Sequence, residues 1–269
     1  MNVRPSAVSA AILAAKEQRR GALVGYLPVG FPDLDTSVEA ALAMARNGVD
    51  VIEFGVPYSD PVMDGLVIQE ATQTALEAGF RVRDVFEAVR RVRAAVDTPV
   101  LVMTYFNPVL QYGVDRFAQE LAAAGGAGLI TPDITPEAAD EWISVSERHG
   151  LDRVFLAAPT SSDERLATIA QMSTGFVYTV STMGITGERD SLDAAARALT
   201  HRLREQGAEL ACVGIGISTA EHVASTLDYA DGAIVGTVFV RALRDGGVEQ
   251  LAATVRELAE GTRVEMPSA

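Results

Sequence analysis

Short apolar runs alternate with amphipathic segments along the whole chain, and this alternation limits the possible folds more than any other feature. The runs are ALVGYLPV (22–29), VDVIEFGVP (49–57), PVLVMTYFN (99–107), GLITPD (128–133), RVFLAAP (153–159), GFVYTVS (175–181), ELACVGIG (209–216) and DGAIVGTVFV (231–240). Most of their positions are apolar in succession, which is typical of parallel strands buried on both faces.

The segments between these runs have helical periodicity. Val38, Leu42 and Ala45 fall on one helical face, and Gly48 follows as a stop signal. Residues 162–173 and 191–207 repeat this design, and residues 66–96 are long enough for two helices divided near Gly79.

Strand and helix therefore alternate eight times, which predicts a (β/α)8 barrel. An additional helix from Ser6 to Arg19 is expected before the first strand. We interpret residues 1–269 as one domain, since no linker, low-complexity tract or charge block divides them. A doubly wound open sheet is the alternative, because periodicity does not say whether a sheet closes.

The charge balance excludes several classes of function. Twenty-two basic and 36 acidic residues give a net charge of −14, so a nucleic-acid or anionic membrane surface is not expected. No apolar run has the ~18–20 residues that span a bilayer. The N-terminus lacks the pattern of a signal peptide, which predicts a cytoplasmic protein. One cysteine and three scattered histidines predict neither a disulfide nor a metal site.

In a (β/α)8 barrel, chemistry occurs where strands end. Glu53 lies in the second apolar run and shares one strand face with Val51 and Gly55, while Ile52 and Phe54 take the other. If the latter pair packs on the helices, Glu53 points into the barrel mouth as a desolvated acid–base group. The alternative is a buried glutamate neutralised by an arginine or by backbone amides.

Two further carboxylates follow Glu53 on the same loop. Asp60 precedes a proline and Asp64 precedes a glycine, so each alone is typical of a turn or a helix cap. Three carboxylates within twelve residues, with no lysine or arginine between Arg46 and Arg81, instead favour a catalytic loop.

Glycines near the ends of the last three runs predict a phosphate site. Gly216 ends the seventh run, and Gly236 and Thr237 lie within the eighth. Barrels commonly bind phosphate near the ends of these two strands, through backbone N–H groups and helix N-termini. The alternative is that these glycines only satisfy backbone geometry. In GITGER, Gly184 and Gly187 bracket a polar segment that is either a closing lid or an ordinary loop.

Tyr26, Tyr105 and Tyr178 fall within or near the first, third and sixth runs. Such tyrosines are often core residues, but three around one mouth also fit a pocket for an aromatic ring. The combined interpretation is a ligand with a phosphate at one end, a flat apolar group at the other, and acid–base carboxylates between them.

The motifs GYLPVGFPD, VIEFGVPYSDPVMDG, MTYFNP, VYTVSTMGITG, GIGIS and IVGT together resemble the tryptophan synthase α chain family. The resemblance runs in order from about residue 21 to 241, and the E-x-G-x-P-x-S-D-P-x-x-D-G segment is its most specific part. It implies a (β/α)8 fold and the cleavage of indole-3-glycerol phosphate to indole and glyceraldehyde 3-phosphate.

The same resemblance implies roles for individual residues. Glu53 and Asp64 correspond to the catalytic pair: the glutamate protonates indole C3, and the aspartate accepts from the indole N–H. The other implied site residues are Tyr26, Met103, Tyr105, Tyr178 and Thr186 for the substrate, and Gly187, Gly216, Gly236 and Thr237 for the phosphate. Leu66 departs from the pattern, because proline often follows the D-G pair, and its loss removes a rigid helix start.

The resemblance also implies a chain without its own cofactor, and a pyridoxal phosphate-dependent β chain as partner in an α2β2 assembly. The residue inventory agrees with that chemistry. Carbon–carbon cleavage in a phosphorylated polyol usually needs a Schiff-base lysine or a divalent metal, yet the only lysine, Lys16, precedes the first strand. The alternatives are a phosphosugar isomerase or epimerase, a non-catalytic partner of the β chain, and a stand-alone lyase that releases indole.

Overall fold

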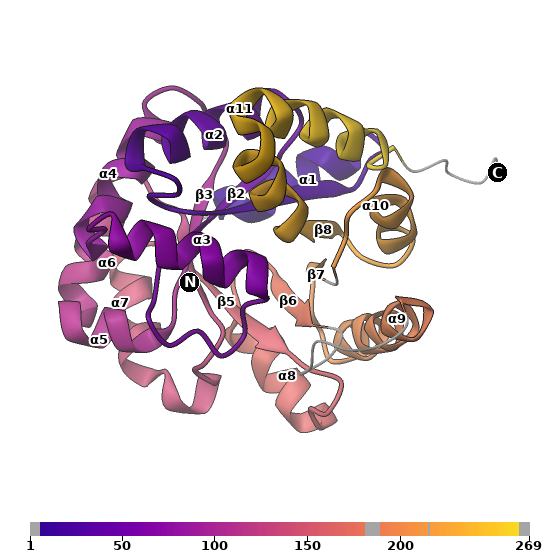
Figure 1. Ribbon diagram of the computed structural model, residues 1–269. Helices are drawn as coiled ribbons and strands as arrows, with labels where there is room; N and C mark the ends of the chain where they lie inside the picture. Colours follow the sequence, from indigo (N-terminus) through magenta and orange to yellow (C-terminus); the bar gives the residue numbers. More distant parts are fainter. Residues whose placement is uncertain (1–5, 181–188, 215, 264–269) are drawn as a thin grey trace.

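A computed structural model describes residues 6–180, 189–214 and 216–263. Its eight parallel strands form a closed barrel in chain order, with β8 paired to β1 (Figure 1). The strands are β1 (Ala22–Pro28), β2 (Val51–Gly55), β3 (Val100–Met103), β4 (Gly128–Thr131), β5 (Asp152–Ala157), β6 (Val177–Val180), β7 (Ala211–Gly214) and β8 (Gly232–Val235). The predicted (β/α)8 barrel is therefore confirmed, and the open-sheet alternative is wrong.

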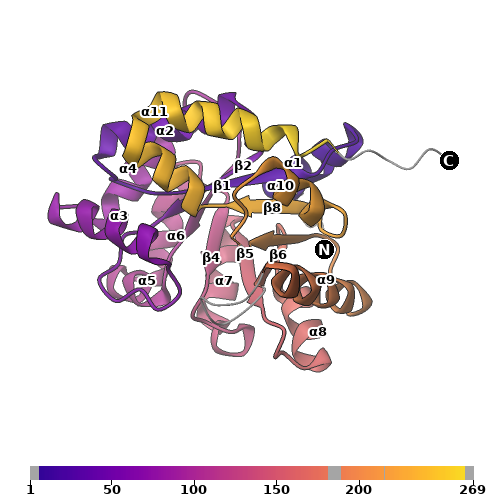
Figure 2. The ribbon, with the colours of Figure 1, turned by 45° about the vertical axis from the view of Figure 1, so that its right-hand side comes forward.

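Helices surround the strands on the outside of the barrel (Figures 1 and 2). They are α1 (Ala7–Glu17), α2 (Leu34–Arg46), α3 (Leu66–Glu77), α4 (Val82–Arg93), α5 (Phe106–Tyr112), α6 (Val114–Ala123), the 3-10 turn η1 (Pro136–Ala138), α7 (Asp140–His149), α8 (Asp163–Met172), α9 (Arg189–Glu205), α10 (Ala220–Leu227) and α11 (Thr237–Glu260). Both views place α11 beside α2, so the last helix closes the ring against the first βα unit.

Two strands are shorter in the structure than the apolar runs that predicted them. The run 231–240 leaves the sheet at Val235, and α11 begins at Thr237, because Gly236 adopts a backbone conformation (φ −124°, ψ −72°) that interrupts the ladder. The run 99–107 ends as a strand at Met103, and α5 begins at Phe106. Apolar residues of the first helical turn are therefore indistinguishable from strand residues by composition.

The predicted N-terminal helix is confirmed as α1, which covers the amino-terminal end of the barrel. Ser6 caps it by accepting a hydrogen bond from the Ser9 N–H at 3.0 Å. Val8 and Ile12 are buried with the side chains that fill the barrel interior, including Val24, Val51, Leu101, Ile130, Val154 and Ile234. This end of the barrel is thus filled by apolar packing, which leaves chemistry to the opposite end.

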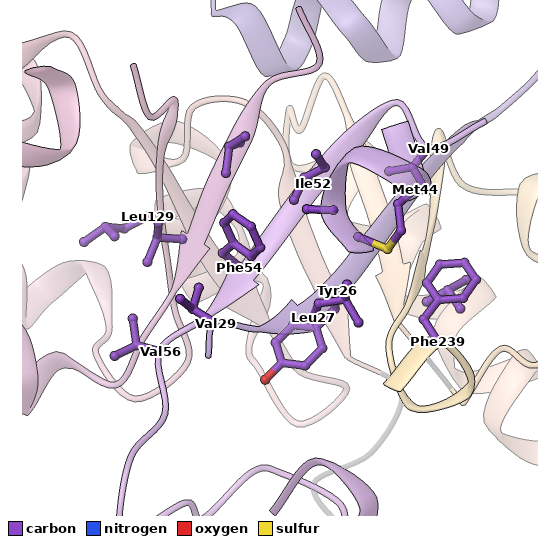
Figure 3. Packing of buried hydrophobic residues seen from close by; sticks show 14 of the residues in the cluster. Tyr26, Leu27, Val29, Met44, Val49, Ile52, Phe54, Val56, Leu129 and Phe239 are labelled. Carbon is purple, nitrogen blue, oxygen red and sulfur yellow. The ribbon is translucent and has the colours of Figure 1, made fainter. Parts of the chain in front are cut away.

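The two faces of β2 divide as the sequence predicted. Ile52 and Phe54 are fully buried between the barrel and its helices, where Figure 3 shows them among apolar side chains of neighbouring elements. Val51 belongs to the interior cluster instead. Because side chains alternate along a strand, Glu53 must face the interior with Val51.

This packing predicts a large loss of stability on truncation of Phe54. Replacing Phe54 by alanine is expected to lower the free energy of unfolding by about 3–5 kcal/mol, because apolar burial is lost and a cavity remains. Val62 is 79% exposed, so Val62→Ala should change it by less than about 0.5 kcal/mol. Urea unfolding followed by circular dichroism measures both, and equal effects would contradict the packing described.

Within the described ranges, no helix combines the length and apolar character needed to cross a membrane.

Candidate active site

Glu53 lies near the carboxyl end of β2, inside the barrel and beside Tyr26 of β1 in the strand register. It is 1% exposed, and its Oε2 atom has no hydrogen-bond partner among the described residues. Burial, followed by the charge of Asp64, raises the pKa of Glu53 from 4.5 to about 8. Within the described residues no salt bridge joins Glu53 to an arginine, and a pKa of about 8 favours the protonated carboxyl at neutral pH. Both observations favour the acid–base interpretation of Glu53 over a glutamate neutralised by an arginine or by backbone amides.

Asp64 stands at the end of the loop that joins β2 to α3. Burial raises its pKa from 3.8 to about 6, so at neutral pH it is mostly ionised. No salt bridge within the described residues involves either Glu53 or Asp64. The site thus combines a neutral carboxylic acid with a carboxylate, and neither pairs with a cation in the part of the chain that the structure describes.

The Tyr26 side chain lies close both to these two acids and to Gly236, which follows β8. Burial and the charges of Asp64 and Glu53, in that order, raise the pKa of Tyr26 well above 10. A Cβ atom on Gly55 would lie 2.3 Å from Tyr26 Oη, and one on Gly236 would lie 3.2 Å from its ring. Glycine is therefore required at the end of β2 to make room for the phenol.

Tyr178 repeats this arrangement on the other side of the barrel. A Cβ atom on Gly214 would lie 2.5 Å from Tyr178 Oη. Burial, then the charge of Glu53, raises the pKa of Tyr178, so its hydroxyl also lies within electrostatic reach of the acid. Tyrosine rings on β1 and β6 thus face the same interior region as Glu53.

Tyr105 and Met103 complete the apolar lining from β3 and the start of α5. Tyr105 is 5% exposed, and burial is the main reason that its pKa rises to about 12. Its ring packs against Tyr58 with centroids 5.2 Å apart. Met103 ends β3 on the interior face and is partly buried against the interior cluster.

The glycines predicted for phosphate binding lie at the ends of β7 and β8. Gly236 is the N-cap of α11 and has no side-chain cap, and Thr237 is the first residue of that helix. Gly216 precedes α10 with φ +62°, a left-handed conformation that favours glycine. Exposed N–H groups at a helix N-terminus attract anions. Thr186 and Gly187, predicted as lid and phosphate residues, lie outside the described residues.

Sequence reasoning missed several residues of this region. Asp133, just beyond β4, accepts a hydrogen bond from the Phe106 N–H at 2.9 Å and so fixes the start of α5. Its signal was a carboxylate directly after an apolar run. Gly55 and Gly214 each lie on the interior face of their strand. A glycine at such a position indicates that a bulky side chain lies close by, and this was the only sequence signal. Gln69, which contacts the backbone of Asp64, gave no signal beyond its place in the first turn of α3.

Among the described residues, no group of three or more histidine, cysteine, aspartate or glutamate side chains is arranged to hold a metal ion.

A closed (β/α)8 barrel with two proton-active carboxyl groups near its strand ends defines the class of barrel enzymes that work by acid–base chemistry. Comparison with known proteins gives the particular family. The family model of the tryptophan synthase alpha chain matches residues 12–267, and the chain belongs to that family, the indole-3-glycerol phosphate lyase subunit of tryptophan synthase.

Individual relatives match this chain along almost its whole length. The tryptophan synthase alpha chain of Leifsonia xyli subsp. xyli is 63% identical over 256 residues, which cover 95% of this chain and 98% of that one. The tryptophan synthase alpha chain of Mycobacterium avium is 53% identical over 250 residues, which cover 93% of this chain and 92% of that one. A solved structure of tryptophan synthase from Mycobacterium tuberculosis superposes with a TM-score of 0.92 at 48% identity, covering 97% of this chain and 100% of that chain.

Proposed function

We propose that Glu53 and Asp64 are the groups with which this chain cleaves indole-3-glycerol phosphate. The observation that carries this assignment is a buried carboxyl group with a pKa of about 8 and an unpartnered oxygen, beside a carboxylate with a pKa of about 6. Keeping an acid buried and unpaired costs stability, and folds accept such a cost mainly at functional sites. Family membership favours this lyase reaction over the isomerase and epimerase alternatives.

The two carboxyl groups divide the chemistry. Protonated Glu53 gives its proton to indole C3, which turns the ring into a cation. The Glu53 carboxylate then takes the proton of the adjacent glycerol hydroxyl, the carbon–carbon bond breaks, and its electron pair returns to the ring. Indole and glyceraldehyde 3-phosphate result, and Glu53 is protonated again. Asp64 accepts from the indole N–H and stabilises the positive charge while it exists.

The remaining predicted residues hold the two ends of the substrate. Tyr26, Met103, Tyr105 and Tyr178 would surround the indole ring. Thr186, which lies outside the described residues, is proposed as a further substrate residue from the resemblance alone. Gly216, Gly236 and Thr237 would bind the phosphate with Gly187, through main-chain N–H groups and the Thr237 hydroxyl. This arrangement explains how a chain with a net charge of −14 binds an anion: the positive potential comes from oriented amides.

The partner assignment follows from the family. Pyridoxal phosphate belongs to the β chain in tryptophan synthase, and this chain supplies indole without a cofactor of its own. We propose further that residues 1–269 act as a single domain, that two copies assemble with two β chains, and that the enzyme works in the cytoplasm. Indole release from indole-3-glycerol phosphate, measured with and without a β chain, separates a dependent subunit from a stand-alone lyase; no release in either case would contradict the proposed activity.

The two pKa values predict a bell-shaped pH dependence. The working form needs Glu53 protonated and Asp64 ionised, and it is populated between about pH 6 and pH 8. Below that range Asp64 gains a proton, and above it Glu53 loses one, so kcat/KM should fall tenfold per pH unit on either side. Initial rates of indole formation from pH 5 to 9.5 test this, and a profile flat through pH 9 would contradict the role of Glu53.

A further inference from the structure

Asp64 lies just before α3, and the N-terminus of this helix has few stabilising interactions of its own. Gly65 is the N-cap of α3, and within the described part of the chain no side chain caps that helix. Leu66, the first helical residue, is 73% exposed and therefore gains little from packing. The first turn also carries no acidic residue that would stabilise it through the helix dipole. Neither the capping of α3 nor the packing of Leu66 thus fixes the backbone at Asp64.

Side chains hold the backbone on both sides of Asp64 instead. The Met63 N–H donates to Tyr105 Oη at 2.8 Å, and Gln69 Nε2 donates to the Asp64 carbonyl oxygen at 2.8 Å. Tyr105 is itself fixed, since it is buried at the start of α5 and packs on Tyr58. Gln69 is anchored by its own N–H, which donates to the Gly65 carbonyl at 3.0 Å. The Val62–Met63 and Asp64–Gly65 peptide units, which flank Asp64, are therefore tied to two separate elements.

We propose that Gln69 and Tyr105 are positioning residues, which hold the Asp64 backbone so that its carboxylate faces the indole N–H. This inference rests on the proposed catalytic role of Asp64. The two hydrogen bonds act in place of a helix cap: one ties the loop to the β3–α5 junction, and the other ties it to the first turn of α3. Displacement of a catalytic group by about 1 Å can cost up to ~10²-fold in rate, so a loose loop would lower turnover without removing any reacting group.

Gln69→Leu tests this inference, since leucine retains much of the side-chain bulk but has no donor. We expect kcat for indole release to fall by about 10-fold to 100-fold, with a smaller change in KM. The matched control is Gln73→Leu, one turn further along α3, where Gln73 donates to Glu77 on an exposed surface. That control should keep wild-type kcat. Tyr105→Phe should resemble Gln69→Leu in kcat, although its place in the proposed indole pocket also affects KM.

A rescue variant distinguishes positioning from general stability. Gly65 has φ −73° and ψ 161°, the extended conformation that residues before proline prefer. Position 66 is the first of the helix, where proline is well tolerated because its missing N–H is not needed. Leu66→Pro should therefore stiffen the same backbone by another route. It should change kcat little alone and restore most of the loss in the Gln69→Leu background.

The outcomes separate this inference from the proposed function. If Asp64→Asn abolishes most activity while Gln69→Leu keeps wild-type kcat, the positioning role is wrong and the catalytic role stands. If Asp64→Asn is fully active, the proposed function fails first. Where positioning holds, Gln69→Leu added to Asp64→Asn should cost almost nothing further, and thermal unfolding of Gln69→Leu should match that of Gln73→Leu. Failure of Leu66→Pro to restore kcat would also count against positioning.

Discussion

Replacing Glu53 by glutamine is expected to lower turnover of indole-3-glycerol phosphate by ~10²–10⁴-fold, the range typical of a general acid–base group. Glutamine keeps the shape of the protonated acid but has no proton to give to indole C3 and cannot take one from the glycerol hydroxyl. Substrate affinity should change much less, since the proposed phosphate and indole contacts remain. Steady-state indole release, with substrate binding measured separately by calorimetry, tests both parts.

The same substitution should leave the fold intact, or stabilise it at high pH. The pKa of Glu53 is raised in the folded chain to about 8, so from about pH 4.5 upward the unfolded chain releases a proton that the folded chain retains. Stability is therefore lost as pH rises through this window, by about 1.4 kcal/mol for each pKa unit. Glu53→Gln removes that loss, and its thermal midpoint at pH 8.5 is expected to equal or exceed that of the native chain.

A buried carboxyl group at the other end of the barrel is the matched control. Asp152 begins β5 and is 7% exposed, but it accepts a hydrogen bond from Ser6 Oγ at the start of α1. Asp152→Asn should therefore affect stability and leave turnover within a few fold of the native rate. Equal loss of activity in both variants would point to a general effect of burying an amide, and the catalytic assignment of Glu53 would fail.

The position of Glu53 could be predicted because it follows from the period of a strand. Alternation along VIEFG places Ile52 and Phe54 on one face and the glutamate on the other, and the apolar pair identifies the outer face. The barrel itself was predictable for a related reason, since eight repeats of strand and helix leave few topologies. What periodicity could not give was closure, because that depends on pairing between β1 and β8, which lie far apart in sequence.

The contacts that shape the site were less predictable, since they join distant segments. Tyr105 meets the loop at Met63 across 42 residues, and Asp133 caps α5 across 27. The sequence predicts the loss of a rigid helix start at Leu66, but the hydrogen bond from Gln69 to Asp64 has no sequence signature. The interior-facing positions of Gly55 and Gly214 indicate a bulky neighbour, but only the structure shows that these neighbours are Tyr26 and Tyr178.

Asp64→Asn is expected to lower turnover by ~10²–10³-fold, because it removes a preformed negative charge beside the ring cation. The asparagine carbonyl still accepts from the indole N–H, so substrate should bind with little change in affinity. Asp60→Asn on the same loop is the control. Asp60 is exposed and accepts a hydrogen bond from Ser59 Oγ at 2.6 Å, so its substitution should leave turnover near the native value.

The pH profile of Asp64→Asn separates its electrostatic role from a structural one. Without a group of pKa about 6, the acid limb of kcat/KM should disappear from the residual activity. The alkaline limb should remain but move below about pH 8, because the charge of Asp64 contributes to the raised pKa of Glu53. Burial is the larger cause of that pKa, so the limb should stay well above 4.5. An alkaline limb unchanged in position would mean that the two carboxyl groups do not interact, and the division of roles between them would be wrong.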